Sequence, residues 1–148
     1  RARDAAAGGD DDHLDAIAAE AQRLRPVITS VGRRLGSAGL FGGHEIPAGT
    51  SVMVSTYLLH TRPDLYPHPY AFRPERFAGK RPETYAWLPF GGGVRRCIGA
   101  AFAQLEMRVV LREILASVDL RTASADRELP FLSGITLVPK RGVPVVAT

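Results

Sequence analysis

The chain contains very little cysteine, since Cys97 is the only one in 148 residues. A single cysteine excludes an internal disulfide and fits a reducing compartment, so we expect a cytoplasmic protein. No run of about 18 apolar residues occurs, and no basic and then apolar leader follows Arg1. The sequence therefore predicts no membrane span and no signal segment within these residues.

Metal-ligand spacing is also missing among the histidines. The chain has four histidines, His13, His44, His60 and His68. Their spacings from each other and from Cys97 do not match those of zinc sites. With 45% hydrophobic residues, the 148-residue chain is long enough for one domain with a sizeable core and too short for two.

Basic runs interleaved with aromatic residues are absent as well. The net charge of +4 permits an acidic partner. However, the arginines are spread along the chain among acidic residues, which is unlike the pattern of proteins that bind single-stranded nucleic acid. We therefore expect no nucleic-acid partner, and keep a basic nucleic-acid-binding or adaptor module only as a remote alternative.

The surroundings of Cys97 suit an anionic sulfur. Three consecutive glycines, Gly91–Gly93, permit tight turns just before a segment with helical periodicity. The sulfur is therefore expected on a loop at a helix N-terminus, where free amide groups, the helix dipole, Arg95 and Arg96 all favour a thiolate. Thiolates bind metals, which makes Cys97 a candidate metal ligand. A lone cysteine is otherwise most often a small buried apolar residue.

The same loop resembles the haem-ligand signature F-x-x-G-x-R-x-C-x-G of the cytochrome P-450 family, the haem-thiolate monooxygenases. Its fixed positions are met by Phe90, Gly93, Arg95, Cys97 and Gly99. The resemblance implies haem b (iron protoporphyrin IX) as the cofactor, with Cys97 as the axial ligand of the haem iron. It also implies that Phe90 lies on the sulfur side of the haem and that Arg95 faces a propionate.

A helix is predicted from Asp12 to Leu24, because apolar residues recur there at helical spacing and Pro26 closes the segment. Glu20 and Arg23 lie three residues apart on one face. Taken alone, such a pair is most often a surface ion pair of little energetic value. In context it resembles the E-x-x-R motif of the family's K helix, placed at about 12–24.

A second box, Phe72–Phe77, resembles the family's P-E-R-F motif. It lies in a proline-rich stretch that can hold only short helical turns, the meander at about 62–89. The resemblance implies that Arg76 joins Glu20 and Arg23 in a buried structural charge network that holds the Cys loop in place. Removal of one member of such a network should cost about 3–5 kcal/mol.

Residues 27–61 alternate in the manner of strands around a glycine-rich turn, which predicts a small β-sheet. By resemblance, Arg33 is the arginine that pairs with a haem propionate, although a solvated pair with Arg34 is the simpler interpretation. The resemblance also places substrate-contact candidates after the K helix and at the tip of a C-terminal hairpin, at about 130–147: Val27, Ile28, Thr29, Leu132 and Ser133.

A long helix, predicted at about 99–118, follows the Cys loop at 90–99. Its apolar residues recur densely, so we expect an amphipathic to largely buried helix. Small residues near its start, among them Ala103, would let it approach the flat haem closely. An apolar stripe on a helix is most often simply core.

Four motifs in one order identify a fold class that is mainly α with small β-sheets (α+β). The resemblance implies that residues 1–148 are the C-terminal, haem-ligating portion of a single bacterial-type cytochrome P-450 domain, with its N-terminal portion absent. No catalytic residue beyond the haem ligand is expected here. The alternative is a truncated, catalytically inactive product that at most binds haem.

The implied reaction inserts one atom of dioxygen into a small organic substrate and reduces the other to water. Its two electrons would come from a donor protein such as ferredoxin or a reductase. We expect four arginines near the sulfur side to attract an acidic partner: Arg95, Arg96, Arg108 and Arg112.

Overall fold

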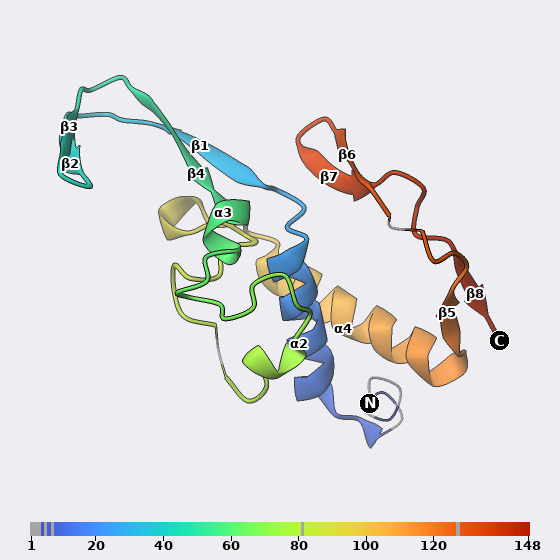
Figure 1. Cartoon of the computed structure of the whole chain (residues 1–148). Helices are drawn as coiled ribbons and strands as arrows, with labels where there is room; N and C mark the ends of the chain where they lie inside the picture. The colour runs from blue at the N-terminus through green and yellow to red at the C-terminus, as the bar shows by residue number, and fades with distance from the viewer. Residues whose placement is uncertain (1–3, 5, 7, 81, 127) are drawn as a thin grey trace.

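The computed structural model describes residues 4, 6, 8–80, 82–126 and 128–148. Two helices form its centre, α2 (Asp11–Leu24) and α4 (Ala100–Ser117), and Figure 1 shows them packed side by side. The Asp10 side chain caps α2 by accepting from the His13 amide at 3.0 Å. Asp11 and Asp12 in the first turn also suit the positive end of the helix dipole.

An antiparallel arm follows α2. Strand β1 (Ser30–Arg34) pairs with β4 (Ser51–Ser55), with Gly32 opposite Met53, and the shorter strands β2 (Gly39–Phe41) and β3 (His44–Ile46) form its end. In Figure 1 this arm extends away from the two helices. The expected small sheet is therefore present as two separate two-stranded ladders.

Short helical turns lie within the proline-rich stretch and on both sides of it. Helix α3 (Thr56–His60) follows β4, the 3₁₀ turn η1 (Pro74–Arg76) lies in the P-E-R-F box, and η2 (Gly93–Arg95) lies in the Cys loop. Thr56, His60 and Tyr66 are buried against α2 or its neighbours, so this irregular stretch is held by packing rather than by regular structure.

The C-terminal residues form two ladders where we expected one hairpin. Strand β6 (Pro130–Ser133) pairs with β7 (Thr136–Pro139) around Gly134, whose φ of +62° suits only glycine at low cost. Strand β8 (Val145–Ala147) turns back to pair with β5 (Leu120–Thr122), which directly follows α4. The last strand is thus anchored at the end of α4 and not on the hairpin.

The apolar core is small and lies between α2 and the meander. Ala16 and Ala19 of α2 pack with Tyr66 and Phe77, and Trp87 covers them. The expectation of a largely buried α4 is wrong for this chain, because Ala100 is its only buried residue among those described. A helix buries only the stripe that faces a neighbour, and the side of α4 that faces α2 is bridged by ion pairs.

Among the described residues, no helix combines the length and the apolar character that crossing a bilayer demands.

Candidate functional site

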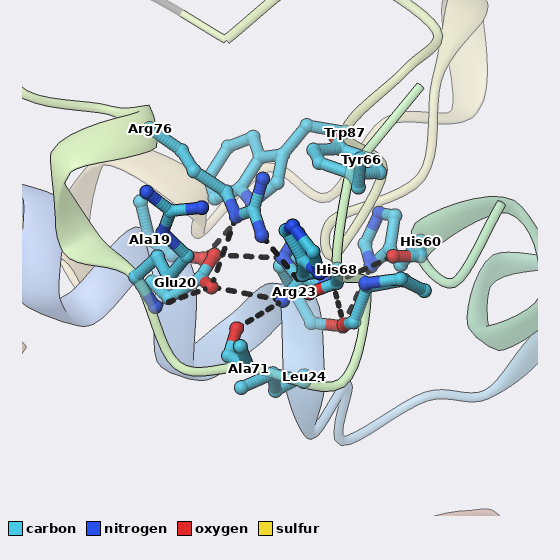
Figure 2. Close-up of polar contacts among 12 residues, drawn as sticks. Ala19, Glu20, Arg23, Leu24, His60, Tyr66, His68, Ala71, Arg76 and Trp87 are labelled. Atoms are coloured by element: carbon cyan, nitrogen blue, oxygen red, sulfur yellow. Dashed lines mark hydrogen bonds and ion pairs between the residues drawn. The ribbon is translucent and has the colours of Figure 1, made fainter. Parts of the chain in front are cut away.

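A buried charge network forms at the C-terminal half of α2. The guanidinium of Arg23 donates to both carboxylate oxygens of Glu20, at 2.7 and 2.8 Å, and both side chains are fully buried. Arg76 of η1 forms an ion pair with the same carboxylate at 3.4 Å, and its Nε makes no hydrogen bond. The Arg73 amide donates to Glu20 Oε1 at 2.8 Å. Figure 2 shows the three charged side chains converging, so the residues named from the resemblance do lie together.

Arg23 has enough partners to explain how a cation is tolerated in the interior. Besides Glu20, its guanidinium donates to the carbonyls of His60 and Pro69 at 2.7 Å and of Ala71 at 3.3 Å. It also lies 5.0 Å from the centre of the Tyr66 ring. Buried charge is costly unless it is paired and its remaining donors are satisfied. Arg23 therefore fastens α2 to the meander at several backbone points.

Three consecutive residues just before the Cys loop, the Ala86–Leu88 segment, are each held by a different element. The Tyr66 hydroxyl donates to the Ala86 carbonyl at 2.8 Å, and burial raises the pKa of Tyr66 to about 12. The Trp87 indole donates to the Ala19 carbonyl of α2 at 3.1 Å. The Leu88 amide donates to His60 Nε2 at 2.8 Å. The start of the Cys loop is therefore fixed to α2 and to the end of α3.

His60 is a functional candidate that the sequence analysis did not find. Its ring is fully buried, and burial is the main reason why its pKa falls from 6.5 to about 4; the nearby charge of Arg23 acts in the same direction. A hydrogen bond to the Arg23 carbonyl partly opposes this shift. No signal in the sequence distinguished it from the other histidines, because its partners are backbone groups far away along the chain.

Turns with positive φ close the Cys loop. Gly91 has φ +69° and Gly93 has φ +65°, conformations in which a residue with a Cβ is strained. The Cys97 amide donates to the Phe90 carbonyl at 2.9 Å, and the Gly91 amide donates to the Leu88 carbonyl at 3.1 Å. Phe90 itself stacks edge-on against Trp87. Backbone hydrogen bonds thus connect the Ala86–Leu88 segment to Cys97 through Phe90 and Gly91.

The thiol of Cys97 is free and exposed, and it lies at the start of α4, whose N-cap is Gly99. Large apolar side chains around it point into open space: Val94 and Ile98 are completely exposed, and Phe102 is 69% exposed. Apolar side chains of this size are rarely left fully exposed without a ligand or partner. The free thiol of Cys97 is thus flanked in the chain by exposed apolar side chains.

The remaining predicted cofactor residues lie on several elements. Arg95 is exposed in η2, and Ala103 is half-buried in the first turn of α4, where its amide donates to the Gly99 carbonyl at 2.9 Å. Arg33 is exposed on β1, and in the described part of the chain its one hydrogen bond is to the neighbouring Gly32 carbonyl, at 2.8 Å. The propionate roles of Arg33 and Arg95 stay predictions.

Two of the four arginines expected to attract an acidic partner are engaged within the chain. Arg108 of α4 donates to both carboxylate oxygens of Asp15, at 2.8 and 2.7 Å, and Arg112 pairs with Asp11. These ion pairs join α4 to α2. The expectation was wrong for Arg108 and Arg112, because their charges are neutralised by α2, whereas Arg95 and Arg96 are exposed.

The predicted substrate-contact residues from the two ends of the chain lie close together. The Leu137 amide of β7 donates to the Val27 carbonyl at 2.7 Å, and Leu137 stands opposite Leu132 in the β6–β7 register. Ser133 stands opposite Thr136, whose hydroxyl donates to its carbonyl at 2.9 Å. Ile28 and Thr29 are half-buried, and the Tyr57 amide donates to the Thr29 carbonyl at 3.2 Å.

A groove of about 890 Å³ lies between α2, α4 and the loop, and Cys97 is not among its lining residues. Ala19, Trp87 and Gly92 line its inner side. Within the described residues, no group of three or more His, Cys, Asp and Glu side chains is placed to hold a metal ion.

Comparisons with known proteins agree on one family. The family model described as Cytochrome P-450 matches residues 12–145. The putative cytochrome P-450 135B1 of Mycobacterium bovis is 47% identical over 98% of this chain, and the putative cytochrome P-450 137 of Mycobacterium tuberculosis is 39% identical over 98%. The chain covers 31% and 30% of these two relatives. It thus spans about a third of the length of the curated relatives it matches.

Solved structures give the same result for the fold. A 6-coordinated cytochrome P-450 from Thermus thermophilus superposes with a TM-score of 0.85 and 33% identity, covering 99% of this chain and 40% of that one. The retinoic acid-bound cyanobacterial CYP120A1 superposes with a TM-score of 0.81 and 30% identity, covering 92% of this chain and 32% of that one. The α+β arrangement described above is shared with both.

Proposed function

This chain belongs to the cytochrome P-450 family, and from that premise we propose that it is the haem-ligating portion of a haem-thiolate monooxygenase, with Cys97 as the axial ligand of the haem iron. Iron protoporphyrin IX is the cofactor of this family. The observation that carries the proposal is the exposed free thiol of Cys97, set on a braced loop and bordered by fully exposed apolar side chains. Residues 1–148 are proposed to be the C-terminal portion of one such domain.

When bound, a haem with a thiolate ligand supplies the chemistry that activates dioxygen and oxidises an organic substrate. This chain's own residues hold the ligand sulfur. Phe90 and Gly93 shape the loop, and the bond from the Cys97 amide to the Phe90 carbonyl fixes the turn that presents the sulfur. Val94 and Ile98 flank Cys97 in the chain and would offer apolar surface to a bound haem. Gly99 and Ala103 leave the start of α4 without bulky side chains.

Charge and substrate recognition are further parts of the proposal. Arg33 and Arg95 would bind the propionates, since both carry exposed guanidinium groups. The hydrogen bond from Leu137 of β7 to Val27 joins the segment after α2 to the β6–β7 hairpin, and this supports one contact surface for a small organic substrate. Arg96, which is exposed, would provide positive charge for an acidic electron donor such as ferredoxin or a reductase.

A second candidate function is haem binding without catalysis. The observation in its favour is that large apolar side chains of α4, such as Phe102 and Leu105, are exposed. In that case the site would load with haem but leave the reaction to a longer or assembled protein.

The test is the carbon monoxide difference spectrum of the reduced, haem-reconstituted chain, compared with Cys97→Ala and Cys97→Ser. A red-shifted Soret band that both variants lose would support thiolate ligation, and the serine variant shows that the loss comes from the sulfur rather than from a changed loop. Oxidation of a substrate panel with an added electron donor then separates the monooxygenase from the haem-binding function. An unchanged spectrum in both variants would refute Cys97 as the ligand.

A further inference from the structure

A reciprocal pair of contacts joins Arg23 and His60. The Arg23 guanidinium donates to the His60 backbone carbonyl at 2.7 Å, and the His60 ring Nδ1 lies 3.2 Å from the Arg23 backbone carbonyl. Each side chain thus holds the main chain of the other, and Figure 2 shows them facing each other between α2 and the end of α3. The other ring nitrogen, Nε2, accepts from the Leu88 amide at 2.8 Å.

These partners fix the tautomer of the ring. A backbone amide can only donate, so Nε2 must carry a lone pair and no proton. A backbone carbonyl can only accept, so Nδ1 must carry the proton. His60 is therefore the neutral Nδ1–H tautomer, and both ring nitrogens are satisfied inside a fully buried side chain.

Leu88 links this ring to the candidate ligand loop. The Leu88 carbonyl accepts from the Gly91 amide at 3.1 Å, and Phe90, two residues after Leu88, accepts from the Cys97 amide at 2.9 Å. Of the three contacts that hold the Ala86–Leu88 segment, only the one to His60 uses a side chain whose ability to accept depends on where its ring proton lies. Tyr66 and Trp87 hold the two neighbouring residues through groups that stay protonated.

We propose that His60 is a positioning residue for the Cys97 loop, transmitting the position of the Arg23–Glu20 network to Leu88 through its neutral Nδ1–H ring. The proposal uses the function suggested above only in taking Cys97 as the ligand. The network then has a second role besides stability, since it sets where the loop begins.

The charged and titratable groups facing the ring all favour the neutral form or leave it unaffected. Arg23 on α2 presents a positive charge, with Glu20 behind it and already engaged by that arginine. The Tyr66 ring of the meander meets His60 edge-on at 6.4 Å. A proton on Nε2 would face the Leu88 amide donor to donor and would break that contact. The lowered pKa of His60 agrees with this arrangement.

Two amide variants test the roles of the two ring nitrogens of His60 separately. In His60→Gln the side-chain oxygen can reach the place of Nε2 and accept from Leu88. In His60→Asn the shorter amide can replace Nδ1 as the donor to Arg23 but reaches no further. Matched controls are His44→Gln and His44→Asn, at an exposed histidine of β3.

The measurement is residue-resolved amide hydrogen exchange of the 148-residue chain without haem. We expect the Leu88 and Cys97 amides to exchange at least about tenfold faster in His60→Asn, and within about threefold of the unaltered rate in His60→Gln, with α4 amides such as Val109 unchanged. Equal acceleration in both variants, or a Cys97 amide that responds to neither, would overturn the proposal.

The ring itself gives a second, independent result. The ¹⁵N shifts of His60 in the unaltered chain should report Nδ1–H at neutral pH, and an Nε2–H or charged ring would refute the proposal even if neither variant folds. Neither of these two measurements needs haem. If Cys97 is not the haem ligand, only the Soret spectrum will show it; if His60 does not position the loop, only the hydrogen exchange and the ¹⁵N shifts will show it.

Discussion

The Arg23–Glu20 network and the surroundings of Cys97 show opposite patterns of burial. In the network, charged and polar side chains are fully buried, whereas around Cys97 large apolar side chains are fully exposed. This difference in burial depends on whether the interaction partners of each region lie within this chain. Every donor of the Arg23 guanidinium finds an acceptor within this chain, but Val94 and Ile98 find no apolar neighbour that covers them among the described residues.

The comparison shows that the Arg23–Glu20 network finds its partners within this chain, whereas the apolar side chains around Cys97 do not. Removing one partner of a buried arginine is costly because the remaining charge is left uncompensated. Exposed apolar surface next to a free thiol indicates a group that binds there later. Stability should therefore respond mostly to changes in the network, and cofactor binding mostly to changes around Cys97.

The largest effect should come from Arg23→Ala, which leaves Glu20 buried without its main partner. We expect a loss of about 3–5 kcal/mol in the free energy of unfolding, measured by urea denaturation. Arg25→Ala is the matched control, since Arg25 is exposed at the end of the same helix, and it should change stability by less than about 0.5 kcal/mol. Similar losses in both variants would mean that the network contributes no more than a surface contact.

A pH effect should follow from His60. Its pKa is about 4 in the folded chain and 6.5 when exposed, so between these values the unfolded state binds more protons than the folded state. Stability from this group is complete above pH 6.5 and is lost as the pH falls toward 4, by about 2 kcal/mol at pH 5. Urea denaturation at pH 7 and pH 5 measures it, and His60→Gln should remove this part of the loss. The same pH dependence in both proteins would exclude His60 as its source.

A smaller effect is expected where α2 meets α4. Arg108→Ala removes ion pairs with Asp15 and Asp11, whose side chains are about two-fifths exposed. Solvent screening limits their value, so we expect a loss of about 1 kcal/mol at low salt that shrinks as salt is raised. Thermal unfolding at two salt concentrations tests this, with Arg121→Ala on β5 as the control. A loss that does not depend on salt would indicate packing of the arginine stem instead.

Ile98→Ser should have the smallest effect on stability, and it tests most directly whether the surroundings of Cys97 bind the cofactor. Because Ile98 is completely exposed, the free energy of unfolding should change by less than about 0.5 kcal/mol. Haem titration followed by the Soret band should nevertheless show weaker binding than in the unaltered chain. A large loss of stability, or unchanged haem affinity, would show that this surface is not shaped for the cofactor.

Local patterns predicted several elements because the signals lie within a few residues. The periodicity of 12–24 predicted a helix that the structure gives as Asp11–Leu24, and the glycines before Cys97 predicted tight turns that appear as positive φ at Gly91 and Gly93. The family resemblance rested on such short patterns and is confirmed by the family match. Of the hairpin predicted at about 130–147, the structure has the β6–β7 part, but β8 pairs with β5, a strand that sequence spacing did not connect to it.

By itself, then, the sequence determined the family, the two long helices and the candidate ligand, because haem-loop signatures, helical periodicity and turn glycines are encoded by neighbouring residues. Helix α3 was not predicted, since residues 27–61 read as extended structure. Only the tertiary structure decided that Glu20 and Arg23 are buried rather than a surface pair, that Arg108 and Arg112 are neutralised by α2, and that His60 joins Arg23 to Leu88. The physical reason is the same in each case. Burial, charge pairing and the tautomer of a ring depend on partners that are distant in the chain, and only folding brings those partners together.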